Sequence, residues 1–401
     1  MKNEIIAVLL RGLCIDITNK PVTVASKNIS DDVPSDALKI EIATIEIKSQ
    51  EINSIEIKSQ ENEENAAKII RSAFENWKKE TLPSCVILTT NGKPQGMFQI
   101  ENHIINNDSC KNKIIIDKNI VDIKERAEVV KNKIAVVTGG AQGIGEEIVR
   151  NLAASGAIVY IADLNIDGAK KLSEKINLEE NRSCTIPVQV NVSSEESVEN
   201  MFDFIAQTTG GFDICISNAG VLKAGSVLEQ DLSDFKFVTD INYTGFFIIS
   251  KFAARVLRTQ NLTAPRWKTD IIQINSKSGL EGSNKNGAYS GGKFGGLGLV
   301  SSFAMELIEY GIKVNAVCPG NFLDGPLWSD PEKGLFVQYL KTGKVPGAKS
   351  IKDVRTFYES KVPMKRGCTG KDLTRAIFYI VEQEYETGQA VPVTGGQVML
   401  H

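Results

Sequence analysis

From about residue 131 onward, the chain alternates short apolar runs with segments of helical periodicity. The apolar runs are rich in Val, Ile and Ala and predict buried strands near residues 133–138, 157–162, 185–190, 212–217, 270–275, 312–317 and 389–393. The intervals between these runs predict helices. Strands that alternate with helices favour an α/β fold, in which a parallel sheet carries helices on both faces.

Residues 1–125 follow a different pattern from the rest of the chain. Apolar residues recur at helical spacing over residues 65–79 and predict a helix there. Two apolar runs at 85–90 and 96–100 flank an Asn-Gly-Lys-Pro sequence and predict a hairpin. We therefore expect a small α+β domain over residues 1–125, of unknown role, ahead of a larger domain over residues 131–401.

This N-terminal extension (residues 1–125) contains a short repeat. The sequence Ile-Glu-Ile-Lys-Ser-Gln occurs at residues 45–50 and again at 55–60. Alternating Ile and Glu suits a strand with one wet face. Two copies are too few for a repeat fold, and a charged linker is the alternative interpretation.

Composition and charge exclude several classes of protein. Of the 401 residues, 42% are apolar and 24% are charged, as in ordinary globular proteins, and the net charge is −3. No nucleic-acid partner is predicted, because such partners favour a strongly basic surface. The apolar run at 5–10 is too short to span a membrane, and Arg11 and Asp16 interrupt any signal-like pattern after it. We expect a cytoplasmic protein without membrane association.

Cysteine and histidine usage argues against a metal centre. The seven cysteines lack the paired spacing of metal sites, and the two histidines, His103 and His401, are too few for a histidine-rich site. A serine-histidine triad is disfavoured for the same reason. No metal is predicted. Cys215 and Cys318 lie in apolar, strand-like runs and are expected to be buried thiols.

A glycine-rich turn lies between the first strand of the larger domain and the helix predicted at residues 146–154. The residues of interest in this turn are Gly139, Gln142, Gly143, Ile144 and Gly145. Backbone N–H groups at such a turn can bind a pyrophosphate, and the glycines allow its close approach. The turn therefore predicts a dinucleotide cofactor.

Asp163 follows the second strand of this domain, where a carboxylate would meet the adenosine ribose of a dinucleotide. Its charge would repel the additional phosphate of NADP, so NAD is the predicted cofactor. Asp163 also fits the N-cap of the next helix, and the sequence leaves both interpretations open.

Tyr289 and Lys293 are four residues apart in a segment that follows Ser276. On a helix this spacing places both side chains on one face, so the ammonium group can favour the phenolate. A free tyrosine, with a pKa of about 10, is a weak base at neutral pH. A general base there requires a fall in the tyrosine pKa of roughly 2–3, which we expect Lys293 and a positively charged nicotinamide to supply together. These residues predict a redox enzyme.

The order of these motifs resembles the short-chain dehydrogenase/reductase family over residues 131–401. Besides the glycine-rich turn, the shared motifs are Asn218-Ala219-Gly220, Asn242, Ser276, Tyr289-x-x-x-Lys293 and Pro319-Gly320. The resemblance implies a Rossmann-like, doubly wound sheet with the cofactor over the carboxyl ends of the strands. It implies that Tyr289 is the general acid/base and that Ser276 orients the reacting oxygen. Lys293 would lower the tyrosine pKa and hold the nicotinamide ribose, and Asn242 would anchor a proton-relay water.

The same resemblance implies further cofactor contacts at Asn191, Val192, Asn218, Ala219, Gly220, Pro319 and Gly320. Two positions depart from the family's pattern. Asn191 stands where an acid is often found, and Asp324 stands where a threonine is usual, which leaves the partner of the nicotinamide amide open. The interval from Asn242 to Ser276 is long, and we expect residues 258–268 to form an enlarged surface loop.

Within the family, the segments 271–279, 292–296, 361–368 and 394–399 resemble the sorbitol-6-phosphate 2-dehydrogenases. This narrower resemblance implies NAD-dependent oxidation of D-sorbitol 6-phosphate to D-fructose 6-phosphate, a small-molecule sugar phosphate substrate. The candidate substrate contacts are Ser276 and, for the phosphate, Lys277, Lys285, Lys365 and Arg366. In the family, the helix that continues from Lys293 commonly builds a subunit interface, which implies a homodimer or homotetramer.

Two alternatives keep the same fold. A short-chain dehydrogenase for another polyol would keep every catalytic residue and differ around residues 277–286 and 321–367. A regulatory NAD-binding protein would need no acid/base apparatus. The complete set of catalytic side chains therefore argues against the regulatory alternative.

Overall fold

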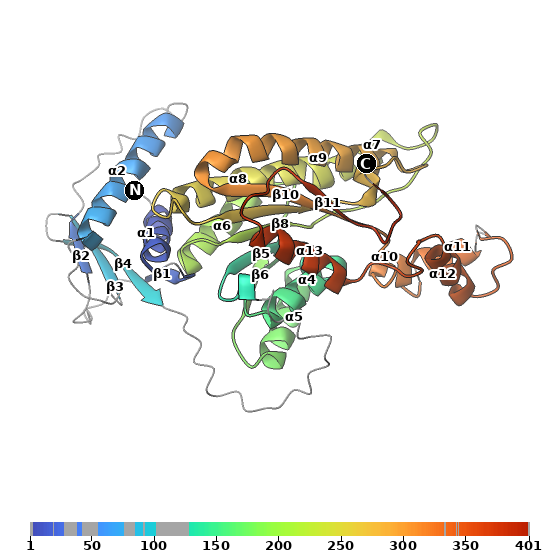
Figure 1. Ribbon diagram of the computed structural model, residues 1–401, viewed down its shortest axis with the longest axis horizontal. Coiled ribbons are helices and arrows are strands. Elements are labelled where there is room, and N and C mark those ends of the chain that lie inside the picture. The colour runs from blue at the N-terminus through green and yellow to red at the C-terminus, as the bar shows by residue number, and fades with distance from the viewer. Residues whose placement is uncertain are drawn as a thin grey trace.

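The computed structural model describes residues 3–18, 20–27, 38–41, 55–75, 85–90, 93–101, 128–332, 334–341, 343 and 345–399. Figure 1 shows a central sheet with helices on both faces, a smaller sheet beside one end of it, and a group of short helices beyond the other end. The first copy of the repeat, at residues 45–50, lies outside the described residues, as do both histidines.

Seven parallel strands form the central sheet. The strands are β5 Ile134–Thr138, β6 Ile158–Asp163, β7 Thr185–Gln189, β8 Ile214–Ser217, β9 Thr269–Ile274, β10 Ile312–Pro319 and β11 Ala390–Val393. Their order is β11-β10-β9-β8-β5-β6-β7, and every neighbouring pair is parallel. The direction of winding reverses between β5 and β8, as in a doubly wound sheet. The predicted Rossmann-like fold and its seven strands are confirmed.

Helices cover both faces of this sheet. One face packs against α4 Gly143–Ala154, α5 Ile166–Glu179 and α13 Gly370–Glu382, and the other against α6 Glu195–Thr209, α8 Gly245–Asn261 and α9 Gly287–Leu307. Strands β5, β8, β9 and β10 are buried along their whole length, because helices exclude water from both of their faces. Shorter elements of this domain are η3 Glu128–Val130, α7 Leu232–Thr239 and η6 Ile308–Tyr310.

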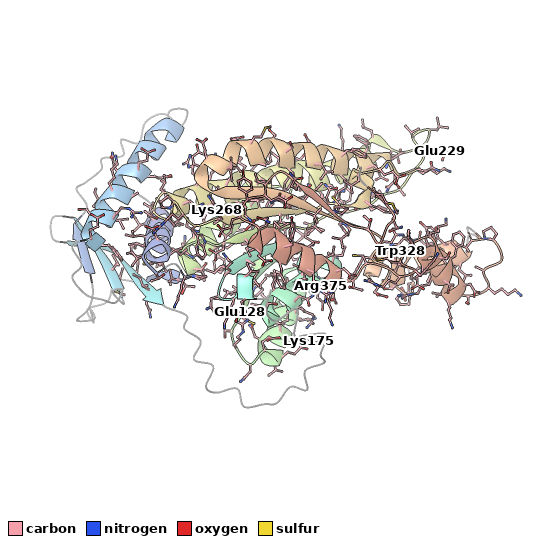
Figure 2. All side chains as sticks on the ribbon, in the orientation of Figure 1. Glu128, Lys175, Glu229, Lys268, Trp328 and Arg375 are labelled. Atoms are coloured by element: carbon pink, nitrogen blue, oxygen red, sulfur yellow. The ribbon has the colours of Figure 1, made fainter. Side chains whose placement is uncertain are left out.

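A lobe of three short helices lies between β10 and α13. These helices are α10 Pro326–Ser329, α11 Leu335–Lys341 and α12 Ile351–Ser360. The lobe has its own apolar cluster, which includes Trp328, Phe336 and Val354, and Trp328 is labelled in Figure 2. Because β10 ends at Pro319, the lobe begins at the carboxyl edge of the sheet.

The extension forms a second, smaller sheet with two helices. Its elements are α1 Asn3–Thr18, β1 Thr23–Lys27, β2 Leu38–Glu41, α2 Ile55–Glu75, β3 Cys85–Thr90 and β4 Lys93–Glu101. The strand order is β1-β4-β3-β2, and β3 and β4 are antiparallel. The predicted helix and hairpin are confirmed. The strand predicted at residues 55–60 is wrong: Glu, Lys and Gln favour a helix, and these residues open α2, which continues into buried Ala66 and Ile70.

Helix α1 packs against α6 and α8 of the larger domain (Figure 1). Gly12 lies so close to the end of α8 that a Cβ atom on it would be 2.0 Å from the Gln260 carbonyl oxygen. The Thr263 hydroxyl donates to the Leu9 carbonyl at 2.8 Å. The surface loop predicted at residues 258–268 is wrong, because α8 runs through its first residues and the extension buries several of those that follow.

Charged side chains are buried where the extension meets the amino ends of β8 and β9. Arg11 pairs with Asp213 at 2.8 Å, and both side chains are inaccessible to solvent. Burial alone would raise the pKa of Asp213, but Arg11 and Lys133 together hold it below its ordinary value. Lys313 pairs with Asp270 at 3.0 Å, although burial keeps the pKa of Asp270 raised. The extension therefore supplies a charge that neutralises Asp213.

Candidate active site

The glycine-rich turn joins β5 to α4 at the carboxyl edge of the sheet. Gly139 and Gly143 have φ values of 61° and 59°, in the left-handed region that favours glycine. A Cβ atom on Gly145 would lie 2.0 Å from the Gly139 carbonyl oxygen, and Ile144 packs on the core below. Gln142 is the N-cap of α4, and its side chain makes no capping hydrogen bond. The first turn of α4 therefore keeps N–H groups available for an anion and fits a pyrophosphate.

Asp163 is the last residue of β6 and faces this turn. Its Oδ2 accepts the Ala141 N–H at 3.0 Å, and its Oδ1 accepts the Asn165 N–H at 2.9 Å. The N-cap of α5 is Asn165, whose side chain accepts the Gly168 N–H at 3.0 Å. The interpretation of Asp163 as a helix cap is therefore wrong, and its carboxylate lies beside the predicted dinucleotide turn.

Thr138 and Asn218 fasten the carboxyl ends of β5 and β8 to each other. The Thr138 hydroxyl oxygen accepts the N–H groups of Asn218 at 3.0 Å and Ala219 at 3.1 Å. Asn218 Nδ2 donates to the carbonyls of Thr138 and Gly139 at 2.9 and 3.0 Å. Both residues thus hold the glycine-rich turn in place. Sequence reasoning gave Thr138 no role, although a hydroxyl at the end of a buried strand was a signal for it.

Asn242 lies in a π-helical turn, η4 Asp240–Thr244, that leads into α8. Its Oδ1 accepts the Val221 N–H and its Nδ2 donates to the Val221 carbonyl, both at 2.8 Å. The buried side chain therefore fixes the segment that follows Gly220. Single π-helical turns are frequent at functional sites, and the relay water implied at Asn242 stays a prediction.

Ser276 follows β9 and is the N-cap of the short helix η5 Lys277–Gly279. Its Oγ accepts the Ser278 N–H at 3.1 Å, which leaves the hydroxyl proton available to donate. The Ser276 side chain is close enough to the Tyr289 phenol to lower its pKa. The structure thus brings together the serine and the tyrosine that the sequence separates by thirteen positions.

Asn275 joins the end of β9 to α9. Its Oδ1 accepts the Ser276 N–H at 2.8 Å, and its Nδ2 donates to the Lys293 carbonyl at 2.9 Å. The residue is buried, and it fixes the position of Ser276 relative to Lys293. Sequence reasoning missed Asn275; the signal was an amide side chain at the end of an otherwise apolar strand.

Tyr289 and Lys293 lie one turn apart on α9, as their spacing predicts. Lys293 is 5% exposed, and its Nζ donates to the Ile274 carbonyl at 2.8 Å. The same Nζ is 5.6 Å from the centre of the Tyr289 ring. Burial lowers the pKa of Lys293 to about 8, although the nearby Cys318 thiol opposes this change.

The chain alone does not produce the fall in the pKa of Tyr289 that we expect from Lys293 and a nicotinamide together. Burial raises this pKa above its ordinary value, and the nearby Ser276 side chain offsets only part of the rise. Lys293 directs its ammonium group at the Ile274 carbonyl, so the phenol receives little of its charge. With the chain alone setting its pKa, Tyr289 is protonated at neutral pH and can donate a proton as an acid.

The remaining predicted cofactor contacts lie at the same edge of the sheet. Asn191 and Val192 follow β7; the Asn191 Oδ1 accepts the Ser193 N–H at 3.1 Å, and Val192 is buried. Pro319 ends β10, and the next residue, Gly320, donates its N–H to the carbonyl at the end of β11 at 2.9 Å.

Asp324, which departs from the family's pattern, has a partner within the protein. It pairs with Arg355 of α12 at 2.7 Å, and Arg355 also pairs with Glu359 at 2.8 Å. Asp324 therefore fastens the start of the lobe to α12. A role for its side chain at the nicotinamide amide gains no support from this contact.

The four cations predicted for the phosphate differ in their surroundings. Lys277 is half-buried directly after Ser276, whereas Lys285 is exposed in the loop before α9. Lys365 donates its Nζ to the Ser360 carbonyl at 2.9 Å. Only Lys277 therefore lies next to the catalytic serine without an ion pair among the described residues.

Arg366 is the fourth of these cations, and it is already paired. Both of its terminal nitrogens bind the Asp372 carboxylate in a bidentate contact. This contact raises the pKa of Arg366 and lowers that of Asp372 to about 2 against the effect of burial. A neutralised guanidinium group has little charge left for a substrate phosphate.

A cavity of about 370 Å³ lies close to this ion pair. Its lining consists of Val362, Met364, residues 366–368, Asp372 and residues 392–398. None of the catalytic side chains lines the cavity.

Other site types find no support in the described part of the chain. No three side chains there are grouped as metal ligands. No helix among the described residues has the length and apolar character that a membrane span requires. Cys215 and Cys318 are free and buried, as predicted, and so are Cys14, Cys184 and Cys368.

A family model described as short chain dehydrogenase matches residues 133–330. The sorbitol-6-phosphate 2-dehydrogenase of Escherichia coli (strain K12) is 35% identical over 271 residues, which are 67% of this chain and 99% of the relative. The chain belongs to the short-chain dehydrogenase family. This short-chain dehydrogenase is therefore an oxidoreductase that acts on an alcohol group of a small molecule with a nicotinamide cofactor.

Two further similarities bear on its substrate. The crystal structure of a sorbitol-6-phosphate 2-dehydrogenase from Erwinia amylovora is 36% identical, with a TM-score of 0.61, and the match covers 66% of this chain and 100% of that one. The trans-4-hydroxycyclohexanecarboxylate dehydrogenase of Sinomonas cyclohexanicum is 30% identical, and the match covers 67% of this chain and 93% of the relative. These relatives are named for different alcohols, so membership of the family defines the reaction class and not the substrate.

Proposed function

We propose that this short-chain dehydrogenase oxidises D-sorbitol 6-phosphate to D-fructose 6-phosphate with NAD, in a reversible reaction. The observation that carries the proposal is the contact of Ser276 with Tyr289, one helical turn from Lys293, at the edge that also holds the glycine-rich turn. The substrate is proposed from the similarity to sorbitol-6-phosphate 2-dehydrogenases over nearly their full length.

The residues at this edge fit a bound NAD. The uncapped N-terminus of α4 suits the pyrophosphate, and the Asp163 carboxylate beside it suits the hydroxyls of the adenosine ribose. The negative charge of Asp163 disfavours the additional phosphate of NADP. Lys293 would hold the nicotinamide ribose on the side of Tyr289.

In the oxidation, Tyr289 removes the proton of the substrate hydroxyl while Ser276 donates a hydrogen bond to the reacting oxygen. Bound NAD supplies the hydride acceptor and a positive ring that favours the phenolate. The Ser278 N–H fixes the Ser276 oxygen, so its proton points away from the short helix. Because burial raises the pKa of Tyr289, we expect oxidation to accelerate as the pH rises above 7.

A dehydrogenase for another alcohol is the second candidate. It is favoured by the similarity to a relative named for a cyclohexane alcohol, over the same share of this chain. Such an enzyme would use the same Ser276 and Tyr289 contact and would differ in the lobe and in the segment after Ser276.

We also propose a homodimer or homotetramer formed through α8 and α9, in a cytoplasmic protein whose first 125 residues form a separate unit. Phe247 on α8 and Phe294 on α9 are 43% and 47% exposed. A Cβ atom on Gly291 or Gly298 would meet no other atom within 4 Å. This apolar face with small residues suits close helix packing, and it lies away from the end of α8 that the extension covers.

The test is the growth of NADH or NADPH absorbance with sorbitol 6-phosphate or unphosphorylated sorbitol, each with NAD and with NADP. We expect turnover of the phosphate ester with NAD to exceed the other three combinations. Equal or faster turnover of unphosphorylated sorbitol would contradict the substrate, and a preference for NADP would contradict the cofactor. Turnover of neither polyol, with intact NADH binding, would favour the second candidate.

A further inference from the structure

Two lysines from different parts of the chain lie toward the carboxyl edge of the sheet, and one of them directly follows Ser276. Lys277 directly follows Ser276 and is half-buried, and Lys361 caps the carboxyl end of α12. Neither forms an ion pair with a described carboxylate, in contrast to Arg355 and Arg366 nearby.

The chain after α12 is fastened to the carboxyl edge of the sheet, which brings Lys361 to this place. A Cβ atom on Gly395 would lie 2.9 Å from the Val362 side chain, and the Met364 N–H donates to the Gly395 carbonyl at 3.2 Å. The Cys368 N–H donates to the Asn321 carbonyl at 2.8 Å. These contacts hold the segment over the ends of β10 and β11, and β10 is the direct neighbour of β9.

Aromatic side chains of the lobe hold the ammonium group of Lys361. Its Nζ lies 4.2 Å from the ring centre of Phe357 and 5.4 Å from that of Tyr358. Tyr358 in turn packs on Trp328, with 4.8 Å between ring centres. The position of this charge is therefore set by the core of the lobe.

The two ammonium groups influence each other. Burial lowers the pKa of Lys277; Glu281 opposes this change and the charge of Lys361 adds to it. Two cations in such a position repel each other, and an anion bound between them would remove the repulsion. In D-sorbitol 6-phosphate the phosphate is four carbons from the reacting carbon, so its partners must lie beside Ser276 and Tyr289 and not on them.

We propose that Lys277 and Lys361 form the phosphate subsite of this enzyme, with Lys361 as the residue that selects phosphorylated over unphosphorylated polyols. The proposal rests on the proposed function. It replaces Lys285, Lys365 and Arg366 as phosphate contacts. Lys361 reaches the site only through the fold of the lobe.

The test compares Lys361→Gln, Lys365→Gln and a control, Lys352→Gln, an exposed lysine on the same helix. We expect Lys361→Gln to raise the KM for sorbitol 6-phosphate about tenfold or more, the loss expected for a charge-assisted hydrogen bond. The KM for NAD and the activity with unphosphorylated sorbitol should not change, and Lys361→Arg should restore most of the affinity. A KM within twofold of the wild type for Lys361→Gln, or a larger rise for Lys365→Gln, would overturn the proposal.

A second readout does not depend on turnover and separates this proposal from the proposed function. With saturating NADH in every sample to occupy the N-terminus of α4, inorganic phosphate, compared with chloride at equal ionic strength, should raise the Tm of the wild type and of Lys352→Gln, but not of Lys361→Gln or Lys277→Gln. If the wild type fails to oxidise sorbitol 6-phosphate but shows this pattern, the proposed substrate is wrong and the subsite stands. An equal rise in Tm for all four proteins, or none in the wild type, would overturn the subsite.

Discussion

The two edges of the central sheet both carry polar side chains, but these are buried and paired at the amino edge and partly accessible at the carboxyl edge. At the amino edge, Asp213 accepts from Arg11 at 2.8 Å and from the Trp267 indole at 3.0 Å, and Lys313 pairs with Asp270. These groups are buried. At the carboxyl edge, Ser276 keeps a proton to donate and Lys277 has no ion pair among the described residues. Charges that are buried and paired stabilise the fold, whereas half-buried, unpaired groups are available for substrate.

The amino edge is completed by residues far away in the sequence. The extension contributes Arg11 to this edge, and it covers residues at the end of α8 such as Thr263. From α2, Arg71 adds a hydrogen bond to the Thr263 carbonyl at 2.8 Å, and Glu63 pairs with Arg258 at 3.1 Å. The extension therefore packs on the catalytic domain and completes the cover of this edge.

Removal of the extension should destabilise the amino edge more than any single substitution. A chain that begins at Val130 would leave Asp213 without Arg11 and would expose Ala264 and Trp267, which pack against the extension. We expect this shortened chain to be insoluble or to unfold far below the full chain, as measured by soluble yield and thermal unfolding. A soluble, active short chain of unchanged Tm would show that the extension does not stabilise the larger domain.

Arg11→Met tests the ion pair alone. Loss of one partner leaves a buried, uncompensated carboxylate, so we expect the free energy of unfolding to fall by about 3–5 kcal/mol. Lys251→Met, which breaks a surface pair with Glu195, is the control and should change it by less than about 1 kcal/mol. Denaturant unfolding at pH 7 measures both, and similar values for the two variants would contradict the structural role of Arg11.

The pH dependence of the unfolding free energy of Arg11→Met tests whether the Asp213 carboxylate causes its loss of stability. The pKa of Asp213 is lower in the folded protein than in the unfolded chain, so its ionisation stabilises the fold above about pH 4. This contribution is lost as the pH falls toward the folded pKa. In Arg11→Met the buried carboxylate lacks its main partner, so burial raises its pKa and it takes up a proton as the pH falls from 7 to 4. We therefore expect the difference in unfolding free energy between wild type and Arg11→Met to shrink from pH 7 to pH 4, and an equal difference at both would exclude Asp213 as the cause.

Asp163→Asn should have a smaller effect, at the carboxyl edge. Asparagine keeps an oxygen for the Ala141 N–H but removes the charge. We expect the ratio of kcat/KM for NAD over NADP to fall about tenfold, equivalent to about 1.4 kcal/mol. Asp167→Asn, in the exposed first turn of α5, should leave the ratio unchanged. The same ratio in both variants would mean that Asp163 only positions the glycine-rich turn.

Local patterns were enough to predict the sheet and the placement of most site residues. Each strand is a short apolar run, and the carboxyl ends of parallel strands share one edge. The glycine-rich turn, Ser276 and the Tyr289 helix therefore meet wherever the chain folds in this way. The spacing of Tyr289 and Lys293 was sufficient to predict their shared helix face.

Features that depend on distant packing could not be predicted. Nothing local to Arg11 shows that it will pair with Asp213, and the helix over residues 55–60 depends on the apolar face that follows it. The pKa of Tyr289 is raised because the phenol is buried and because Lys293 donates to the Ile274 carbonyl. The spacing of the two residues in the sequence shows neither fact. Lys361 likewise reaches the site only through the lobe.

The most direct test of the catalytic edge is the turnover of Tyr289→Phe with sorbitol 6-phosphate and NAD, measured beside NADH binding. The change removes the proton acceptor and little else, so kcat should fall by about 10²–10⁴ while NADH affinity stays unchanged. Tyr385→Phe, at a fully exposed tyrosine, should match the wild type. A Tyr289→Phe enzyme that retains turnover within tenfold of the wild type would contradict the assignment of the reaction to Ser276 and Tyr289.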